Sequence, residues 1–110
     1  MFLNLVITKK NQVMGVKVFV ELQVKEEKLE QIRPLFAALL QGTRSREGNE
    51  GVLVYTDQDN PTTIVLIEQW VSRDHYDEYN KWRGEQGDLT KLAKLLVRPP
   101  RRRYFDYFGV

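Results

Sequence analysis

The fold is decided by residues 51–71, which read GVLVYTDQDNPTTIVLIEQWV. Two runs rich in β-branched residues, 51–56 and 62–71, are joined by a polar segment that contains Asp, Asn and Pro. This combination is typical of two antiparallel strands connected by a hairpin loop. The second run is apolar on both faces, which predicts a strand that is covered on both sides.

The residues before this hairpin predict one more strand and a helix. Residues 16–24 (VKVFVELQV) place a valine or leucine at every second position, which is the period of a strand. In residues 25–41 the apolar positions change to steps of three and four, the stripe of an amphipathic helix. Gly42 is expected to end this helix. Pro34 predicts a kink, or a helix whose firm part begins close to it.

The residues after the hairpin predict two helices and a last strand. Ser72 is the expected N-cap of the first helix, which the two glycines of residues 84–87 break. Asp88 is expected to cap a second, short helix that ends at the proline pair 99–100. The aromatic-rich residues 101–108 (RRRYFDYF) then predict the last strand.

The predicted order is β-α-β-β-α(α)-β, which is the ferredoxin-like arrangement of an α+β domain. In this arrangement the helices cover one face of a four-stranded antiparallel sheet. The strands nevertheless carry apolar residues on both faces, and a large uncovered apolar face marks an association surface. We therefore expect a homodimer that forms through the open sheet face. Residues 16–110 are predicted to be this domain, and residues 1–15 an N-terminal arm or edge strand.

Composition excludes several classes of site. The chain of 110 residues contains no cysteine, so disulfides, iron–sulfur clusters and thiolate zinc sites are excluded. His75 is the single histidine, which removes any two-histidine metal site. We expect no metal. A membrane anchor is not expected either, because the early apolar stretch 1–7 is far shorter than the roughly 18–20 residues that a bilayer requires. The absence of a leader-like segment predicts a cytoplasmic location.

The net charge of +2 is unevenly distributed along the chain. Residues 89–105 contain six Lys or Arg residues and no acidic residue. This run is interpreted either as an anion site or as the solvated flank of the last strand. It is short and the remainder of the chain is acidic, so nucleic-acid binding is not expected.

Three short motifs resemble the antibiotic biosynthesis monooxygenase (ABM) family. They are the stretch 47–51 (EGNEG) before the second strand, the hairpin DQDNP, and Glu68-Gln69-Trp70 at the end of the third strand, followed by a helix. The resemblance covers residues from about 16 to 108. It implies a dimeric α+β barrel with a pocket between the sheet and the helices of each subunit. The best-known members oxidise aromatic polyketides with molecular oxygen and use no metal, flavin or nicotinamide cofactor.

The resemblance also implies site residues. Trp70 falls on the tryptophan of the family's E-x-W motif, and Tyr76 falls on its pocket tyrosine, so these two are the expected catalytic residues. The family's pocket asparagine is Leu66 here, and many members carry a histidine where this chain has Tyr79. Leu66 and Tyr79 are expected to contact the substrate. The asparagine and the late histidine of the haem-degrading relatives are absent, which disfavours that activity.

Three further residues are candidates for substrate contact. Glu68 shares a strand face with Trp70, so it is expected either to form a salt bridge or to act as a general base with a raised pKa. Trp82 and Arg83 are interpreted as a pocket rim or as a stacked surface pair. In the first role, Arg83 places positive charge near a developing anion. His75 is expected to be exposed.

A cofactor-free oxygenase needs a substrate that can itself supply electrons. An enol or phenol that loses a proton can pass one electron to oxygen, while the protein excludes water and stabilises the anion. The sequence therefore predicts a monooxygenase that acts on a small aromatic or quinone-type molecule with molecular oxygen. Two alternatives stay open. One is an isomerase of a small phosphorylated sugar-like signal, anchored by Arg101–Arg103 as in an autoinducer-2-degrading relative. The other is a non-catalytic dimeric ligand-binding stress module.

Overall fold

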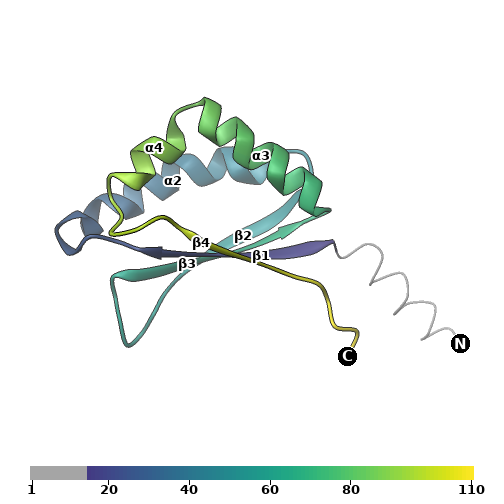
Figure 1. Cartoon of the computed structure of the whole chain (residues 1–110), viewed down its shortest axis with the longest axis horizontal. Coiled ribbons are helices and arrows are strands. Elements are labelled where there is room, and N and C mark those ends of the chain that lie inside the picture. Colours follow the sequence, from purple (N-terminus) through teal and green to yellow (C-terminus); the bar gives the residue numbers. More distant parts are fainter. Residues whose placement is uncertain (1–14) are drawn as a thin grey trace, which may run out of the picture.

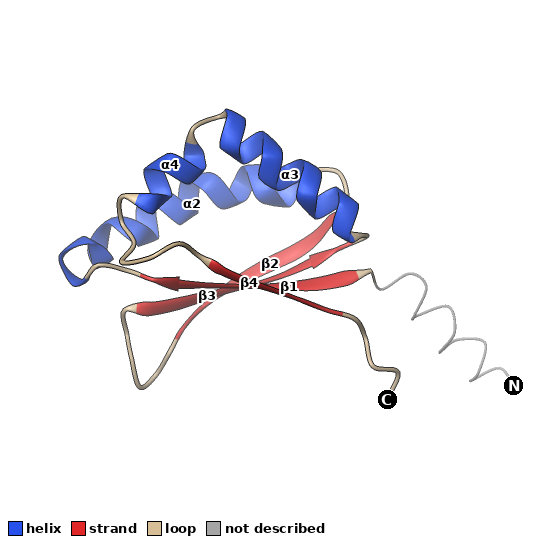
Figure 2. Cartoon of the chain, in the orientation of Figure 1, coloured by secondary structure: helices blue, strands red, loops and turns tan. Residues whose placement is uncertain are grey.

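The computed structural model describes residues 15–110 and shows one antiparallel sheet with all helices on one side of it (Figure 1). The strand order is β2-β3-β1-β4. This is the predicted ferredoxin-like α+β fold, and Figure 2 shows the two layers by colour. The elements follow the chain as β1 (Val16–Gln23), a 3-10 turn (Glu26–Lys28), α2 (Leu29–Ser45), β2 (Asn49–Thr56), β3 (Thr63–Trp70), α3 (Arg73–Glu85), α4 (Asp88–Ala93) and β4 (Arg101–Phe105).

Strand alternation assigns each side chain to the helix side or to the outer side of the sheet. On β1 the buried positions Val16, Val18, Val20 and Leu22 face the helices and form the centre of the core. Val18 pairs with Glu68 on β3, so Glu68 shares the helix side with these valines. The outer side carries the intervening residues, and no helix of residues 15–110 covers it (Figure 1).

The β2–β3 hairpin confirms the loop predicted from the DQDNP segment. The carboxylate of Asp57 accepts the backbone N–H groups of Asp59 at 2.8 Å and Asn60 at 3.2 Å. These two hydrogen bonds fix the conformation of the loop, so β3 returns beside β2 in a defined register.

The first helix corrects the prediction at Gly42. α2 continues through Pro34 and Gly42 and ends at Ser45. A Cβ atom at position 42 would lie 3.1 Å from Nη2 of Arg83. The glycine is therefore explained by the close approach of this guanidinium to α2 and not by a helix end.

The later elements confirm Ser72 and correct several boundaries. Ser72 caps α3, and its hydroxyl accepts the backbone N–H of His75. Gly84 lies inside α3, and the N-cap of α4 is Gly87, with φ of 81°. Asp88 is the first residue of α4 and not its cap, and its carboxylate forms an ion pair with Arg83 instead. α4 ends at Ala93, well before the proline pair, and β4 is shorter than predicted. The predicted N-terminal arm lies outside the described residues, apart from Gly15.

Candidate active site

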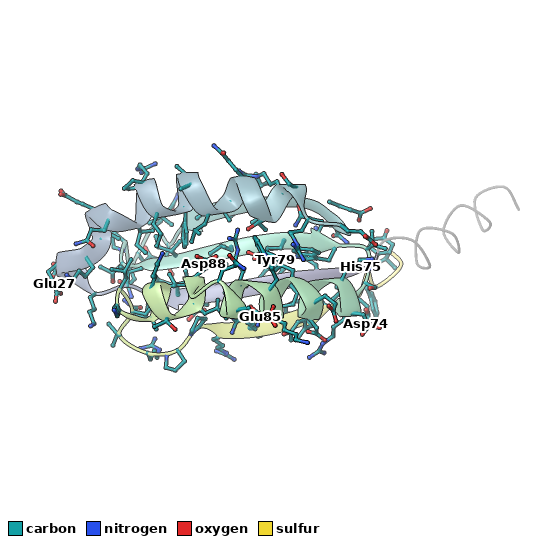
Figure 3. All side chains as sticks on the ribbon, turned by 90° about the horizontal axis from the view of Figure 1, so that it is seen from above. Glu27, Asp74, His75, Tyr79, Glu85 and Asp88 are labelled. Carbon is teal, nitrogen blue, oxygen red and sulfur yellow. The ribbon has the colours of Figure 1, made fainter. Side chains whose placement is uncertain are left out.

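A small cavity lies between the sheet and the three helices. β1, β3 and β4 form its floor, α2 forms one wall, and α3 and α4 form the other. In Figure 3, Tyr79 and Asp88 lie between α2 and the α3–α4 pair. The lining side chains divide into an apolar group and a polar group. The apolar group is Val20, Phe36, Leu39, Leu40, Leu66, Leu89 and Leu92; the polar group is Thr43, Glu68, Tyr76, Tyr79, Asn80, Arg83, Asp88 and Arg102.

Glu68 is the buried carboxylate of this cavity. Only 3% of the residue is exposed, and its Oε1 accepts the indole N–H of Trp70 at 2.8 Å. Its second oxygen, Oε2, receives no hydrogen bond from the described part of the chain. Burial raises the pKa of Glu68, while the Trp70 hydrogen bond and the positive charges of Arg102 and Arg83 oppose that effect. Glu68 was predicted either to form a salt bridge or to have the raised pKa of a general base. It forms no salt bridge among residues 15–110, and its pKa is raised.

Trp70 lies behind the cavity. It is completely buried and does not line the cavity wall. Its ring packs against the rings of Tyr76 and Tyr79, with centroid distances of 5.7 Å and 5.0 Å. Through its N–H group it fixes the carboxylate of Glu68. The structure thus gives Trp70 the geometry of a positioning residue, and its catalytic role stays a prediction.

Tyr76 reaches the cavity from α3 and pairs with a residue of β4. Its hydroxyl accepts the Nε–H of Arg102 at 2.8 Å, and Nη2 of Arg102 donates to Asn80 Oδ1 at 3.4 Å. Burial is the main cause that raises the pKa of Tyr76. The phenol therefore keeps its proton near neutral pH and can donate it to an oxygen in the cavity.

Tyr79 and Arg83 belong to a buried network that joins α2, α3 and α4. Arg83 donates from Nε to the Tyr79 hydroxyl at 3.0 Å and from Nη1 to Asp88 Oδ2 at 2.9 Å. Its Nη2 donates to Thr43 Oγ1 at 3.0 Å and to the backbone carbonyl of Leu39. These partners take up four of the five N–H groups of the guanidinium, and with 6% exposure it is not a free cation of the cavity. Tyr79 offers the cavity mainly its ring.

Two other predicted contact residues occupy different environments. Leu66 lines the cavity with an apolar side chain where the ABM pattern has an asparagine. Trp82 is half-buried and does not line the cavity. The guanidinium of Arg83 lies 4.7 Å from its ring centroid, so the predicted stacking of these two residues is present, but Arg83 is buried and the pair does not lie on the surface. The guanidinium of Arg46 lies 4.3 Å from the same centroid.

His75 is half-buried and not exposed, which corrects the prediction. Its Nδ1 lies 2.7 Å from the Ser72 hydroxyl, and its Nε2 lies 3.5 Å from a carboxylate oxygen of Glu47. The side chain thus joins the start of α3 to the turn before β2. It lies outside the cavity described above.

Replacing Ser72 with Ala is expected to reduce the free energy of unfolding by about 1 kcal/mol, because α3 loses its N-cap oxygen. Ser45→Ala is the matched control, since that exposed hydroxyl donates only to the backbone carbonyl of Gln41. Chemical denaturation of both variants measures the difference. If Ser72→Ala and Ser45→Ala have equal free energies of unfolding, Ser72 does not stabilise α3 as its N-cap.

Sequence reasoning missed Asn80, Thr43 and Asp88 as cavity residues, and it considered Arg102 only as one member of the cluster Arg101–Arg103. For Arg102 a signal was available. Three consecutive strand residues alternate between faces, so the cluster Arg101–Arg103 cannot place all three side chains on the helix side. The other three residues are placed by how α2, α3 and α4 pack, which no local pattern shows.

The cavity is small, with a volume of about 60 Å³. Pockets for drug-sized ligands commonly measure about 300–1,000 Å³. A polycyclic molecule does not fit this volume, and a single ring enters only if a wall moves. α4 is the wall best suited to move, because none of its residues is buried. It follows the turn at Gly87.

Two absences apply to residues 15–110. No helix there combines the length and apolar character needed to cross a membrane. The described side chains also form no group of three or more His, Asp or Glu residues suited to hold a metal ion.

Comparison with known families decides the assignment of the chain. Residues 15–83 match the family model described as antibiotic biosynthesis monooxygenase, and this match covers β1 through most of α3. The chain belongs to the ABM family. The matched segment includes Glu68, Trp70, Tyr76 and Tyr79. Arg102 lies beyond it, so its place in the ABM cavity rests on the structure.

Solved structures show the same fold at low sequence identity. A conserved protein from Methanosarcina mazei Go1 has 20% identity and a TM-score of 0.79, over 89% of this chain and 97% of its own. A structure named as an antibiotic biosynthesis monooxygenase has 21% identity and a TM-score of 0.75, over 84% and 97%. A Mycobacterium tuberculosis protein has 24% identity and a TM-score of 0.72, over 86% and 96%. No curated protein sequence matches the chain.

Proposed function

We propose that this ABM protein is a cofactor-independent monooxygenase that oxidises a small aromatic hydroquinone with molecular oxygen. The observation that carries the proposal is the carboxylate of Glu68. It is buried in the cavity, its pKa is raised, and one of its oxygens has no hydrogen-bond donor among the described residues. A carboxylate in this state is a stronger base than a solvated one, as proton abstraction from a phenol requires.

The proposed reaction starts with transfer of the phenolic proton to Glu68. The anion passes one electron to oxygen, and the two radicals combine into a C–O bond at the ring carbon. The resulting peroxide takes a proton. Loss of the C–H proton from that carbon then breaks the O–O bond and releases water. One hydroquinone and one O₂ thus give one hydroxyquinone and one water, and the substrate supplies all four electrons.

The remaining cavity residues support this chemistry. The rings of Tyr76 and Tyr79 and the side chains of Val20 and Leu66 provide apolar walls for an aromatic ring. The Tyr76 hydroxyl can donate to an oxygen anion. A dry site strengthens this interaction, because there is little water to screen it.

The arginines of β4 do not favour the phosphosugar isomerase. Arg101 and Arg103 are exposed, and Arg102 alone lines the cavity. A single guanidinium beside a buried carboxylate is a poor site for a dianionic phosphate, because Glu68 repels the second charge.

The proposal includes a homodimer formed through the open sheet face. The register aligns Leu53, Ile67 and Phe19 in one row across the outer side, with Tyr55 and Val65 in the next. Leu53 is 60% exposed in the single chain, although a large apolar residue there favours burial. Leu53→Asp is expected to shift the sedimentation coefficient from a dimer to a monomer. The exposed exchange Gln58→Asp in the β2–β3 loop should leave it unchanged.

Oxygen uptake with a panel of single-ring benzohydroquinones tests the proposed activity. The expected result is consumption of one O₂ per hydroxyquinone formed, with no hydrogen peroxide. Tyr76→Phe, which removes one anion donor, is expected to lower kcat by about tenfold. Release of peroxide in proportion to the oxygen consumed would show simple autoxidation and would overturn the proposal.

A further inference from the structure

β4 carries three consecutive arginines, and only the middle one enters the cavity. Arg102 pairs in register with Val20 on β1, whose side chain lines the cavity floor. Arg101 and Arg103 are exposed on the outer side of the sheet. Three neighbouring residues of the same type are therefore separated by strand alternation into one site residue and two surface residues.

The guanidinium of Arg102 is held in place by neutral oxygens. Its Nε donates to the Tyr76 hydroxyl and its Nη2 to Asn80 Oδ1, both on α3. No carboxylate of residues 15–110 lies within ion-pair distance of it, whereas Arg83 has the carboxylate of Asp88 at 2.9 Å. Arg102 is half-buried, so its charge is only partly solvated, and Glu68 is the buried carboxylate that it acts on, without forming an ion pair with it. Such a cation is stabilised by an anion placed in the cavity.

The position of Glu68 fixes where that anion forms. β3 and β4 flank β1, so their backbones are about 9.6 Å apart, twice the interstrand spacing. Val20 pairs with Arg102 on β4 and with Leu66 on β3, whereas Glu68 pairs with Val18, two residues along β1. A ring lying over Val20 therefore has Arg102 directly beside it and Glu68 at a diagonal position on the opposite side. A substrate that arrives neutral avoids repulsion by Glu68 and becomes an anion only after it transfers its proton.

We infer that Arg102 is a substrate-binding residue that holds the ionised oxygen of the substrate, together with the Tyr76 hydroxyl. The substrate class is then an acidic single-ring phenol or enol that binds neutral and ionises in the cavity. This inference rests on the proposed function and specifies its substrate. It also assigns a role to a residue outside the segment that matches the ABM family model.

The test uses 4-nitrophenol, a single-ring phenol whose ionised form absorbs visible light. Its affinity and the pKa of the bound probe are measured by absorbance titration against wild type and Arg102→Met. Wild type is expected to bind the phenolate and to lower the pKa of the bound probe. Arg102→Met is expected to lose about 10- to 100-fold in phenolate affinity, the effect of one charge-assisted hydrogen-bonding group.

Two matched controls separate this role from general electrostatics. Arg101→Met and Arg103→Met remove the same charge from the outer face and should leave the affinity and the probe's pKa unchanged. The methyl ether 4-nitroanisole cannot ionise and should bind wild type and Arg102→Met equally. Arg102→Gln serves as a second variant if the methionine variant is unstable in a thermal melt.

The outcomes distinguish the inference from the proposed activity, because binding is read without turnover. Equal losses in all three arginine variants, no loss in Arg102→Met, or no binding of the probe to wild type would each overturn the inference. If the probe binds as predicted but no hydroquinone consumes oxygen, the anion site stands and the oxygenase proposal fails.

Discussion

Glu68→Gln is expected to reduce oxygen-dependent turnover by about 10²- to 10⁴-fold, the usual contribution of a positioned general base. The glutamine has nearly the same shape, and its carbonyl can still accept the Trp70 N–H group. Only the ability to take a proton is removed. In wild type the rate is expected to rise with pH through the raised pKa of Glu68. The residual rate of Glu68→Gln should not show this rise with pH.

Stability measurements provide the control for this variant. Because the folded-state pKa of Glu68 is raised, the folded protein binds more protons than the unfolded chain between the ordinary carboxyl pKa and the raised value. The free energy of unfolding of wild type therefore falls as pH rises through that window. Glu68→Gln lacks this loss, so at neutral pH it should be at least as stable as wild type. A variant that is inactive because it is unfolded would contradict the assigned role.

Arg83→Met is expected to cause the largest loss of stability. Asp88 keeps a largely buried charge, with 14% of its side chain exposed, and loses its partner. Breaking a buried ion pair from one side commonly costs about 3–5 kcal/mol. In a domain of this size the melting temperature should fall by at least about 12 °C. Thermal and chemical denaturation measure the two quantities.

Arg46→Met is the matched control for this prediction. Arg46 and Arg83 both lie over the Trp82 ring, with guanidinium carbons 4.3 Å and 4.7 Å from its centroid. Arg46 forms no ion pair in the described part of the chain, so the expected loss is about 0.5–1 kcal/mol. The double variant Arg83→Met with Asp88→Leu removes both charges and should recover part of the stability. If the double variant is as unstable as Arg83→Met, the loss does not arise from the unpaired carboxylate.

The sheet could be predicted because its strands carry local signals. The alternation of residues 16–24 and the apolar run of residues 62–71 define β1 and β3, and Asp57 defines the turn between β2 and β3. Each of these features acts within a few residues of the chain. The ABM motif at Glu68 and Trp70 is also contained within a few residues, so it could be recognised from the sequence.

The cavity could be predicted only in part, because packing between distant elements completes it. Gly42 has the sequence signature of a helix end, yet it lies inside α2 to admit a guanidinium from α3. Asp88 has the signature of a helix cap, but it is the counter-ion of Arg83. Arg102 lines the cavity, and Arg101 and Arg103 do not, because of the register between β1 and β4. None of these pairings can be read from one segment alone.

Incorporation of ¹⁸O₂ distinguishes oxygenation from simple oxidation, because it reports where each oxygen atom goes. The purified protein is mixed with a hydroquinone substrate in unlabelled water under ¹⁸O₂, and the product is analysed by mass spectrometry. Wild type is expected to give one ¹⁸O atom in each hydroxyquinone, and Glu68→Gln is expected to form the same product far more slowly. A hydroxyquinone without label has taken its oxygen from water after plain oxidation to the quinone. That result would contradict a monooxygenase that uses Glu68 as its base.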